Sequence, residues 1–288
     1  MLASDWDELF AEGRLRTRAQ AVQRRRRADA GVWSHATAAA LHALPLYRVR
    51  SDRVSMTRHG AHPRQSRADT KWHFAPLRDD EIVVRDGMRV TCLDRTVYDV
   101  IRTESLEAAV ACFDAALRLV AWDADANEYD YPAAEEFRAQ VRHRVLSHAG
   151  ARGIIQARFV TAFADGRAQL PGESVSRLWM MQLDLMPPHL QYRIELGDGR
   201  YAMLDFAWPE LGLWGEFDGE VKYSDARIVG ERDRDGILAD QRERENRIRE
   251  VTGWQCHRWG FEKMQTFDAF VAFLRSIRVY PALRRAER

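Results

Sequence analysis

Apolar residues recur at helical spacing in several segments of the chain. In one of them Leu106, Val110, Phe113, Leu117 and Val120 lie three or four residues apart, which predicts a helix with one buried face. Similar patterns predict helices over 9–28, 34–44, 93–101, 133–147, 151–163 and 173–185. The first of these has few apolar positions, so we expect a helix that faces solvent or a partner.

Short β-prone runs lie between residues 47 and 91, broken by Gly, Pro and Asp. Asp86-Gly87 is a strong signal for a tight hairpin within them. We therefore expect an α+β region with a small antiparallel sheet. The polar stretch 166–172 is the best linker candidate, and 288 residues are about twice a typical domain length. The sequence thus predicts two domains, residues 1–165 and 166–288.

The second half contains three runs with strand character, at 190–196, 201–208 and 211–217. A two-residue turn at Pro209-Glu210 would pair Trp208 with Leu211 and place Asp205 opposite Trp214. Because strand side chains alternate between faces, Asp205 would then share a face with Glu216 and Asp218.

Carboxylates that share one face repel one another, and a divalent cation with oxygen ligands, Mg²⁺ or Mn²⁺, would relieve that repulsion. The same cation would polarise a phosphodiester and activate a water molecule. An acidic strand edge that faces solvent is an alternative of about equal weight.

The composition, 46% apolar and 30% charged, is that of a soluble globular protein, and no apolar run is long enough to span a membrane. The acidic N-terminus lacks the pattern of a secretory signal, so we expect a cytoplasmic protein.

Three cysteines suit neither a disulfide framework nor a zinc site. The net charge of +1 conceals seven arginines and no acid between Arg14 and Arg27. Only three of the 44 basic residues are lysines, and one of them, Lys222, follows the acidic positions.

Glu173, the segment Asp205-Phe-Ala-Trp-Pro209 and the segment Gly215-Glu-Phe-Asp-Gly-Glu-Val-Lys-Tyr223 resemble PD-(D/E)XK endonuclease-like domains. The branch similar to very-short-patch-repair endonucleases also matches at 241–249 and 253–259. The resemblance implies an α/β restriction-endonuclease-like fold with a mixed sheet flanked by helices.

The resemblance also implies roles for single residues. Asp205 and Glu216 would bind the metal and Glu173 would support them. The lysine that activates water in such domains is replaced here by Asp218, which we assign a supporting role. We take Lys222 as the substitute that orients the water.

In the first half, Ser34–Pro45 and Val90–Asp99 are similar to AbiEi-like antitoxin proteins of abortive-infection systems. Those relatives usually begin with a DNA-binding winged helix, and we expect this chain to start just after it. Our preferred hypothesis is a Mg²⁺- or Mn²⁺-dependent endonuclease-like hydrolase in DNA repair or phage defence. The alternative is a non-catalytic antitoxin or transcriptional regulator with a cognate toxin as partner. A nuclease fold retained only as a binding platform is a third possibility. The nucleic acid, most simply DNA, would be contacted by Arg24, Arg25, Arg26, Arg27, Arg244 and Arg247.

Overall fold

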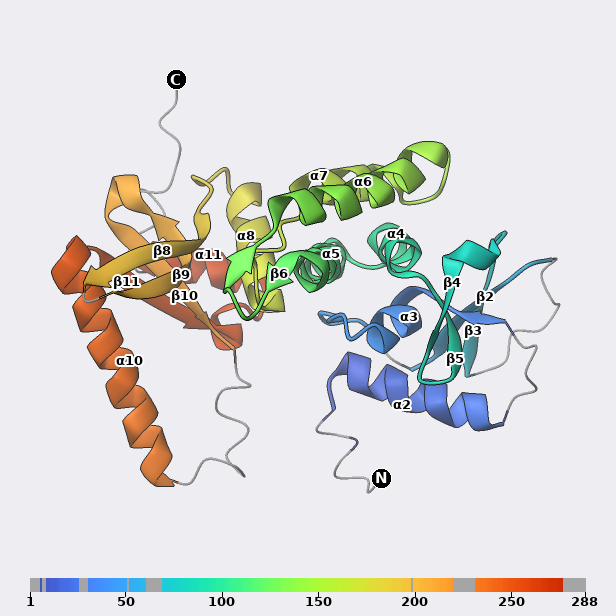
Figure 1. The fold of residues 1–288 in the computed structure, drawn as a ribbon, viewed down its shortest axis with the longest axis horizontal. Coiled ribbons are helices and arrows are strands. Elements are labelled where there is room, and N and C mark those ends of the chain that lie inside the picture. The colour runs from blue at the N-terminus through green and yellow to red at the C-terminus, as the bar shows by residue number, and fades with distance from the viewer. Residues whose placement is uncertain are drawn as a thin grey trace. The chain divides into compact units, whose positions relative to one another are not determined.

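The computed structural model describes residues 6, 9–25, 31–50, 52–60, 69–197, 199–219 and 231–276, with the backbone alone over most of 231–238 (Figure 1). Internal contacts divide the chain into two compact units, Met1–Pro171 and Gly172–Arg288. Each unit has its own sheet and its own buried side chains, and each is described by itself.

The larger sheet of the first unit has five strands in the order β3-β2-β1-β5-β4, and β6 (Trp122–Asp123) pairs with β7 (Glu128–Tyr129) in a second sheet. The five strands are β1 (Val32–Trp33), β2 (Val54–Arg58), β3 (Thr70–Phe74), β4 (Ile82–Arg85) and β5 (Met88–Thr91). β1 is parallel to β5 and β2 is parallel to β3, whereas β1–β2 and β4–β5 are antiparallel. The sheet is therefore mixed, and the prediction of an antiparallel sheet was wrong. Parallel neighbours are joined through long connections, which leave no local signal in the sequence.

The hairpin prediction at Asp86-Gly87 is confirmed. Both residues have positive φ, 48° and 72°, as a two-residue turn of this type requires. The turn joins β4 to β5 with Arg85 paired to Met88.

The helices of the first unit are α2 (Ala11–Arg24), α3 (His35–Leu41), α4 (Leu93–Thr103), α5 (Leu106–Ala121), α6 (Tyr131–Ser147) and α7 (Ile154–Phe163). The stripe predicted on α5 is buried at Val110, Phe113 and Leu117 and ends in the exposed Val120. α2 buries Leu15, Ala19 and Val22 and packs against α3. The expectation that this helix is solvated or faces a partner is thus wrong for the face that carries these three residues. None of the helices in the described ranges is long and apolar enough to cross a membrane.

The second unit is built on a four-stranded sheet in the order β11-β10-β9-β8. The strands are β8 (His189–Gly197), β9 (Arg200–Trp208), β10 (Leu213–Asp218) and β11 (Gln255–Gly260). The first three are antiparallel and β11 runs parallel to β10, so the sheet is mixed as predicted. The helices are α8 (Pro171–Gln182), α10 (Glu231–Thr252) and α11 (Phe267–Ser276).

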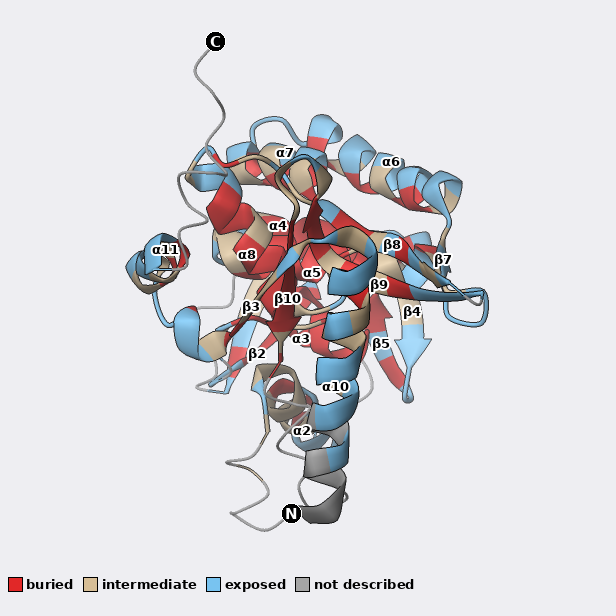
Figure 2. Ribbon diagram, turned by 90° about the vertical axis from the view of Figure 1, so that its left-hand side faces the viewer, coloured by how far each residue is buried: buried red, intermediate tan, exposed pale blue. Residues whose placement is uncertain are grey.

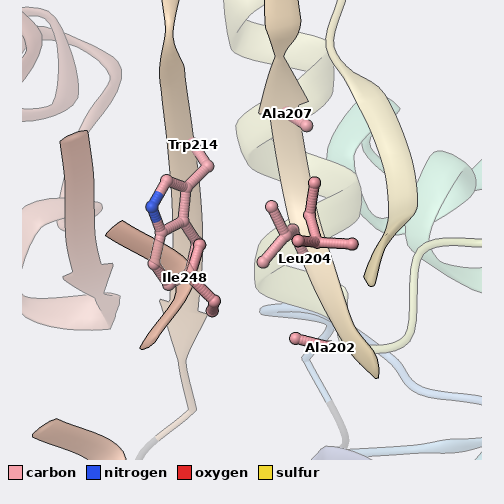
Figure 3. Close-up of a cluster of buried hydrophobic side chains, with 6 residues drawn as sticks. Ala202, Leu204, Ala207, Trp214 and Ile248 are labelled. Atoms are coloured by element: carbon pink, nitrogen blue, oxygen red, sulfur yellow. The ribbon is translucent and has the colours of Figure 1, made fainter. Parts of the chain in front are cut away.

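Helices cover both faces of this sheet. On one face Trp259 donates to the Ser176 hydroxyl of α8 at 2.8 Å and packs against Phe270 of α11. On the other face Ile248 of α10 packs with Trp214 and Leu204 (Figure 3). α10 carries many exposed residues on its outer side, whereas β10 is buried along most of its length (Figure 2).

The connection between β9 and β10 is longer than the sequence suggested. Pro209–Leu211 form a 3-10 turn that Gly212 closes at a positive φ of 61°. Trp208 therefore pairs with Leu213 and Trp214 with Ala207. The predicted pairs, Trp208 with Leu211 and Asp205 with Trp214, were wrong by two residues. A two-residue shift leaves the assignment of side chains to faces unchanged.

A tight contact fixes the first turn of α8 against β10. A Cβ atom added at Gly172 would overlap the buried ring of Phe217. We expect Gly172→Ala to lower the free energy of unfolding by about 1–3 kcal/mol, because the core there has no room for a methyl group. Urea unfolding followed by circular dichroism measures this.

The matched control is Gly236→Ala, on α10, where an added Cβ would meet nothing within 4 Å. That substitution should stabilise the protein by up to about 1 kcal/mol through helix propensity. Equal stability of the two variants would contradict the packing at Gly172.

Candidate functional site

The acids predicted from the sequence lie on three elements of the second unit. Asp205 is on β9, Glu216 and Asp218 are at the C-terminal end of β10, and Glu173 is in the first turn of α8. The β9–β10 ladder is paired up to Gly215 and Phe206. One further step in this register brings Glu216, rather than Trp214, opposite Asp205.

Beyond the end of this ladder, the side chain of Asp205 connects β9 to β10. Its Oδ2 accepts the backbone N–H of Phe217 at 3.0 Å, and its Oδ1 accepts from the side-chain amide of Gln191 at 3.3 Å. Asp205 therefore binds the backbone of the residue between Glu216 and Asp218. This contact ties the carboxylate of one strand to the acidic end of the next.

β9 changes the face of its side chains at this point. Leu204 packs with Trp214 beneath α10, whereas Phe206 lies 5.1 Å from the ring of Trp259 on the opposite face. The neighbouring strand is irregular at the same place, since Gln191 has a positive φ of 47°. Regular alternation would have put Leu204 and Phe206 on one face. The irregularity is what lets Asp205 lie along the sheet toward Phe217.

Glu216 is buried and paired with two arginines. Arg244 of α10 donates to its Oε1, and Nη1 of Arg258 lies 2.5 Å from its Oε2. Arg258 stands directly opposite Glu216 in the β10–β11 ladder and also lies 3.4 Å from Asp218. Glu216 thus has both carboxylate oxygens occupied by guanidinium groups.

Glu173 and Lys222 complete the predicted set. Glu173 is buried, with 1% of its surface exposed, next to the glycine that packs on Phe217. The structure brings Asp205, Glu216 and Asp218 to one end of β10 and sets the helix turn of Glu173 beside it. Lys222 lies outside the described residues.

Two residues of the site were missed from the sequence. The sequence contained a signal for Arg258, because this residue precedes Trp259 in a short strand whose end lies next to the acids. Gln191 carried none, since its contact with Asp205 depends on the distortion of β8. Arg244, which we expect to contact nucleic acid, pairs with Glu216 in this structure.

A divalent cation at this site would have a small set of carboxylate ligands. Among the described residues, no three His, Cys, Asp or Glu side chains are grouped so as to hold a metal ion. Mg²⁺ is commonly held by one or two carboxylates, with water and substrate phosphates completing its shell. Asp205 of β9 and Glu216 of the neighbouring β10 would supply such a pair. Glu216 would have to exchange one guanidinium for the cation.

The arginines predicted to contact nucleic acid lie in two places. Arg24 and Arg25 are exposed at the C-terminal end of α2, and Arg26 and Arg27 lie outside the described residues. Arg247 lines a groove of about 490 Å³ along α10 together with Glu243 and Glu250. The charge of that groove is mixed rather than basic.

A second group of buried polar residues belongs to the first unit. Glu81 and Asp94 both pair with Arg144, and Arg95 bridges Glu81 to the fully buried Asp99. Glu81, Asp94, Arg95 and Arg144 border a cavity of about 800 Å³ between α4 and α6. Although burial opposes it, the hydrogen bonds from the Arg78 N–H and from Arg144 lower the pKa of Glu81. Each acid of this network has an arginine partner, which indicates a structural role.

Two stacked histidines lie beside this network. The rings of His35 and His73 are 3.4 Å apart, and His35 Nδ1 lies 3.0 Å from the Ser34 hydroxyl. Burial and the nearby Arg102, Arg95 and Lys71 lower the pKa of His35 well below its ordinary value. Burial and His35 lower the pKa of His73 to about 3. Both rings are therefore neutral in the folded protein at pH 7.

Comparison with known proteins finds two relatives in Mycobacterium tuberculosis, one from strain CDC 1551 and one from strain H37Rv. Each is 35% identical to this chain over 132 residues and is described only as an uncharacterized protein. The match covers 46% of this chain and 44% of each relative, so the chain spans less than half the length of the relatives it matches. No family model matches the chain, and no solved structure matches it significantly.

The stacked histidines predict a pH dependence of stability. Below pH 6.5 a histidine in the unfolded chain binds a proton, whereas the buried ring in the folded protein stays neutral. Stability is therefore complete above about pH 6.5 and is lost as the pH falls toward about 3 for His73. The expected loss is at most about 1.4 kcal/mol per pH unit for each histidine.

Replacing His73 with Phe keeps a ring against His35 and removes one titrating group. Between pH 7 and pH 5 its free energy of unfolding, from urea titrations, should fall less than that of the wild type. His143→Gln, at an exposed histidine, is the control and should follow the wild type. If His73→Phe loses as much stability as the wild type over this range, the buried histidines do not cause the dependence.

Proposed function

We propose that the second unit is a divalent-cation-dependent hydrolase of nucleic-acid phosphodiesters. The observation that carries this proposal is the bond from the Phe217 N–H to Asp205, which ties the carboxylate of β9 to the part of β10 that carries Glu216. The resemblance of the 205–209 and 215–223 segments to endonuclease-like domains supports the same activity. DNA is the substrate we favour.

The residues of the site have different roles in the proposed hydrolase. Asp205 and Glu216 hold the cation, Mg²⁺ or Mn²⁺, which polarises the phosphodiester and lowers the pKa of a water molecule. Asp205 is kept in place by Phe217 and Gln191, so it is oriented before the cation arrives. Glu173 and Asp218 support the pair through their charge, and Lys222 orients the attacking water.

A second candidate function is a nuclease-like fold used only for binding. The pairing of Glu216 with both Arg244 and Arg258 favours it, because a carboxylate neutralised by two guanidinium groups is stable without a cation. In that case the unit serves a non-catalytic protein, such as the antitoxin or regulator that the first half of the sequence resembles. Co-purification of the chain with a nucleotidyltransferase-like toxin would support this function.

Substitution of the two carboxylates tests the activity. Asp205→Asn and Glu216→Gln should each slow Mg²⁺- or Mn²⁺-dependent cleavage of plasmid and single-stranded DNA by about a hundredfold or more, since the metal contributes several kcal/mol to the transition state. Gel assays with and without EDTA measure the rate.

The control is Glu243→Gln, which removes a carboxylate from the outer side of α10. It should cleave at the wild-type rate. Cleavage that persists in the Asp205 and Glu216 variants and resists EDTA would reject the assignment. A wild-type chain that binds DNA without ever cutting it would favour the binding function.

A further inference from the structure

The two arginines that hold Glu216 are not equivalent. Arg258 is paired with Glu216 across the parallel ladder and also faces Asp218 at 3.4 Å and Glu245 at 3.7 Å. It therefore has three carboxylate neighbours. Its side chain is 23% exposed. Moving Arg258 away would break its ion pairs with all three carboxylates, which is costly for partly buried groups.

Arg244 has fewer acidic partners. Glu216 is the one carboxylate that it contacts among the described residues, and it also donates to the backbone carbonyl of Met203 at 2.6 Å. Its guanidinium lies 5.8 Å from the ring of Trp214, and its side chain is 35% exposed. It reaches Glu216 from α10, whose outer side faces solvent (Figure 2). Of the two arginines, Arg244 is the more exposed and has fewer carboxylate partners to lose when it leaves.

A cation can reach Glu216 only by replacing a guanidinium. Arg244 occupies Oε1 and Arg258 occupies Oε2. A guanidinium that stayed beside a divalent cation on the same oxygen would also be repelled by it. The positions of the two arginines therefore make cation binding a competition with Arg244.

We propose that Arg244 is an exchangeable counter-ion of Glu216, displaced by the divalent cation and then used to bind a phosphate of the nucleic acid. This inference rests on the proposed function, because it assumes that Glu216 receives a cation. Arg244 is suited to the second role because a guanidinium binds phosphate oxygens through paired hydrogen bonds. Cation binding and nucleic-acid binding then assist each other, and the coupling works in both directions.

Calorimetric titration of Mn²⁺ into the full chain tests the competition. Arg244→Met keeps the aliphatic part of the side chain and removes its charge. It should bind Mn²⁺ about tenfold or more tightly than the wild type, since a charge-assisted hydrogen bond no longer competes for Glu216. Arg244→Lys keeps the charge and should bind Mn²⁺ less tightly than Arg244→Met. Arg242→Met, an exposed arginine on the same helix, is the matched control and should match the wild type within about twofold.

Nucleic-acid affinity gives the second readout. Fluorescence anisotropy with a labelled DNA duplex in Ca²⁺, a cation used to limit cleavage, should show binding by wild type that strengthens as the cation is added. In Arg244→Met the factor by which the cation strengthens DNA binding should be at least about fivefold smaller than in the wild type. Circular dichroism confirms that each variant is folded, and Arg244→Lys provides the test if Arg244→Met is not.

The outcomes separate this inference from the proposed function. Equal Mn²⁺ affinity in wild type and Arg244→Met overturns the exchange and leaves a cation-dependent hydrolase in place. Mn²⁺ binding by Arg244→Met alone supports the exchange. If neither protein binds Mn²⁺, both the exchange and the cation-dependent activity are rejected.

Discussion

The hydrogen bond from the Phe217 N–H to the Asp205 carboxylate joins β9 and β10 beyond the last backbone pair of their ladder. A buried backbone N–H needs a partner, and here a side chain provides it. Because Phe217 stands between Glu216 and Asp218, the bond also fixes the end of β10 that carries them. The ring of Phe217 rests on Gly172, so the helix turn that contains Glu173 is placed by the same residue. The acidic site therefore depends on the hydrogen bond between Phe217 and Asp205 and on the packing of the Phe217 ring.

Charge compensation distinguishes the two groups of buried ionic residues. In the first unit, Arg144 and Arg95 each bridge two carboxylates, so that removing one partner leaves another charge uncompensated. In the second unit, Arg258 is bridged in the same manner, but Arg244 adds a single bond to a carboxylate from the side of a solvent-facing helix. The first arrangement is suited to holding α4 and α6 together with the sheet. The second is suited to exchange, which a binding site requires.

The proposed function of this protein rests on the site, since the relatives it matches are described only as uncharacterized and the match covers less than half of each. In that proposal Asp205 and Glu216 would hold a cation, and the arginines around them would bind a phosphate. A guanidinium and a cation would then share Glu216 in turn. Hydrolysis of a phosphodiester would use both groups.

The sequence determined the features that depend on neighbouring residues. Asp86-Gly87 predicted its hairpin because both positions need positive φ, and the spacing on α5 predicted the buried Val110, Phe113 and Leu117. It also named the acids of the site. The tertiary structure alone decided how distant segments pair: the parallel strands of the first sheet, the two-residue shift after Trp208, and the change of face at Asp205. It alone brought Arg244 and Arg258 onto Glu216 from elements 28 and 42 positions further along the chain. Local patterns encode turns and faces, whereas contacts between remote segments follow from packing and charge once the chain has folded.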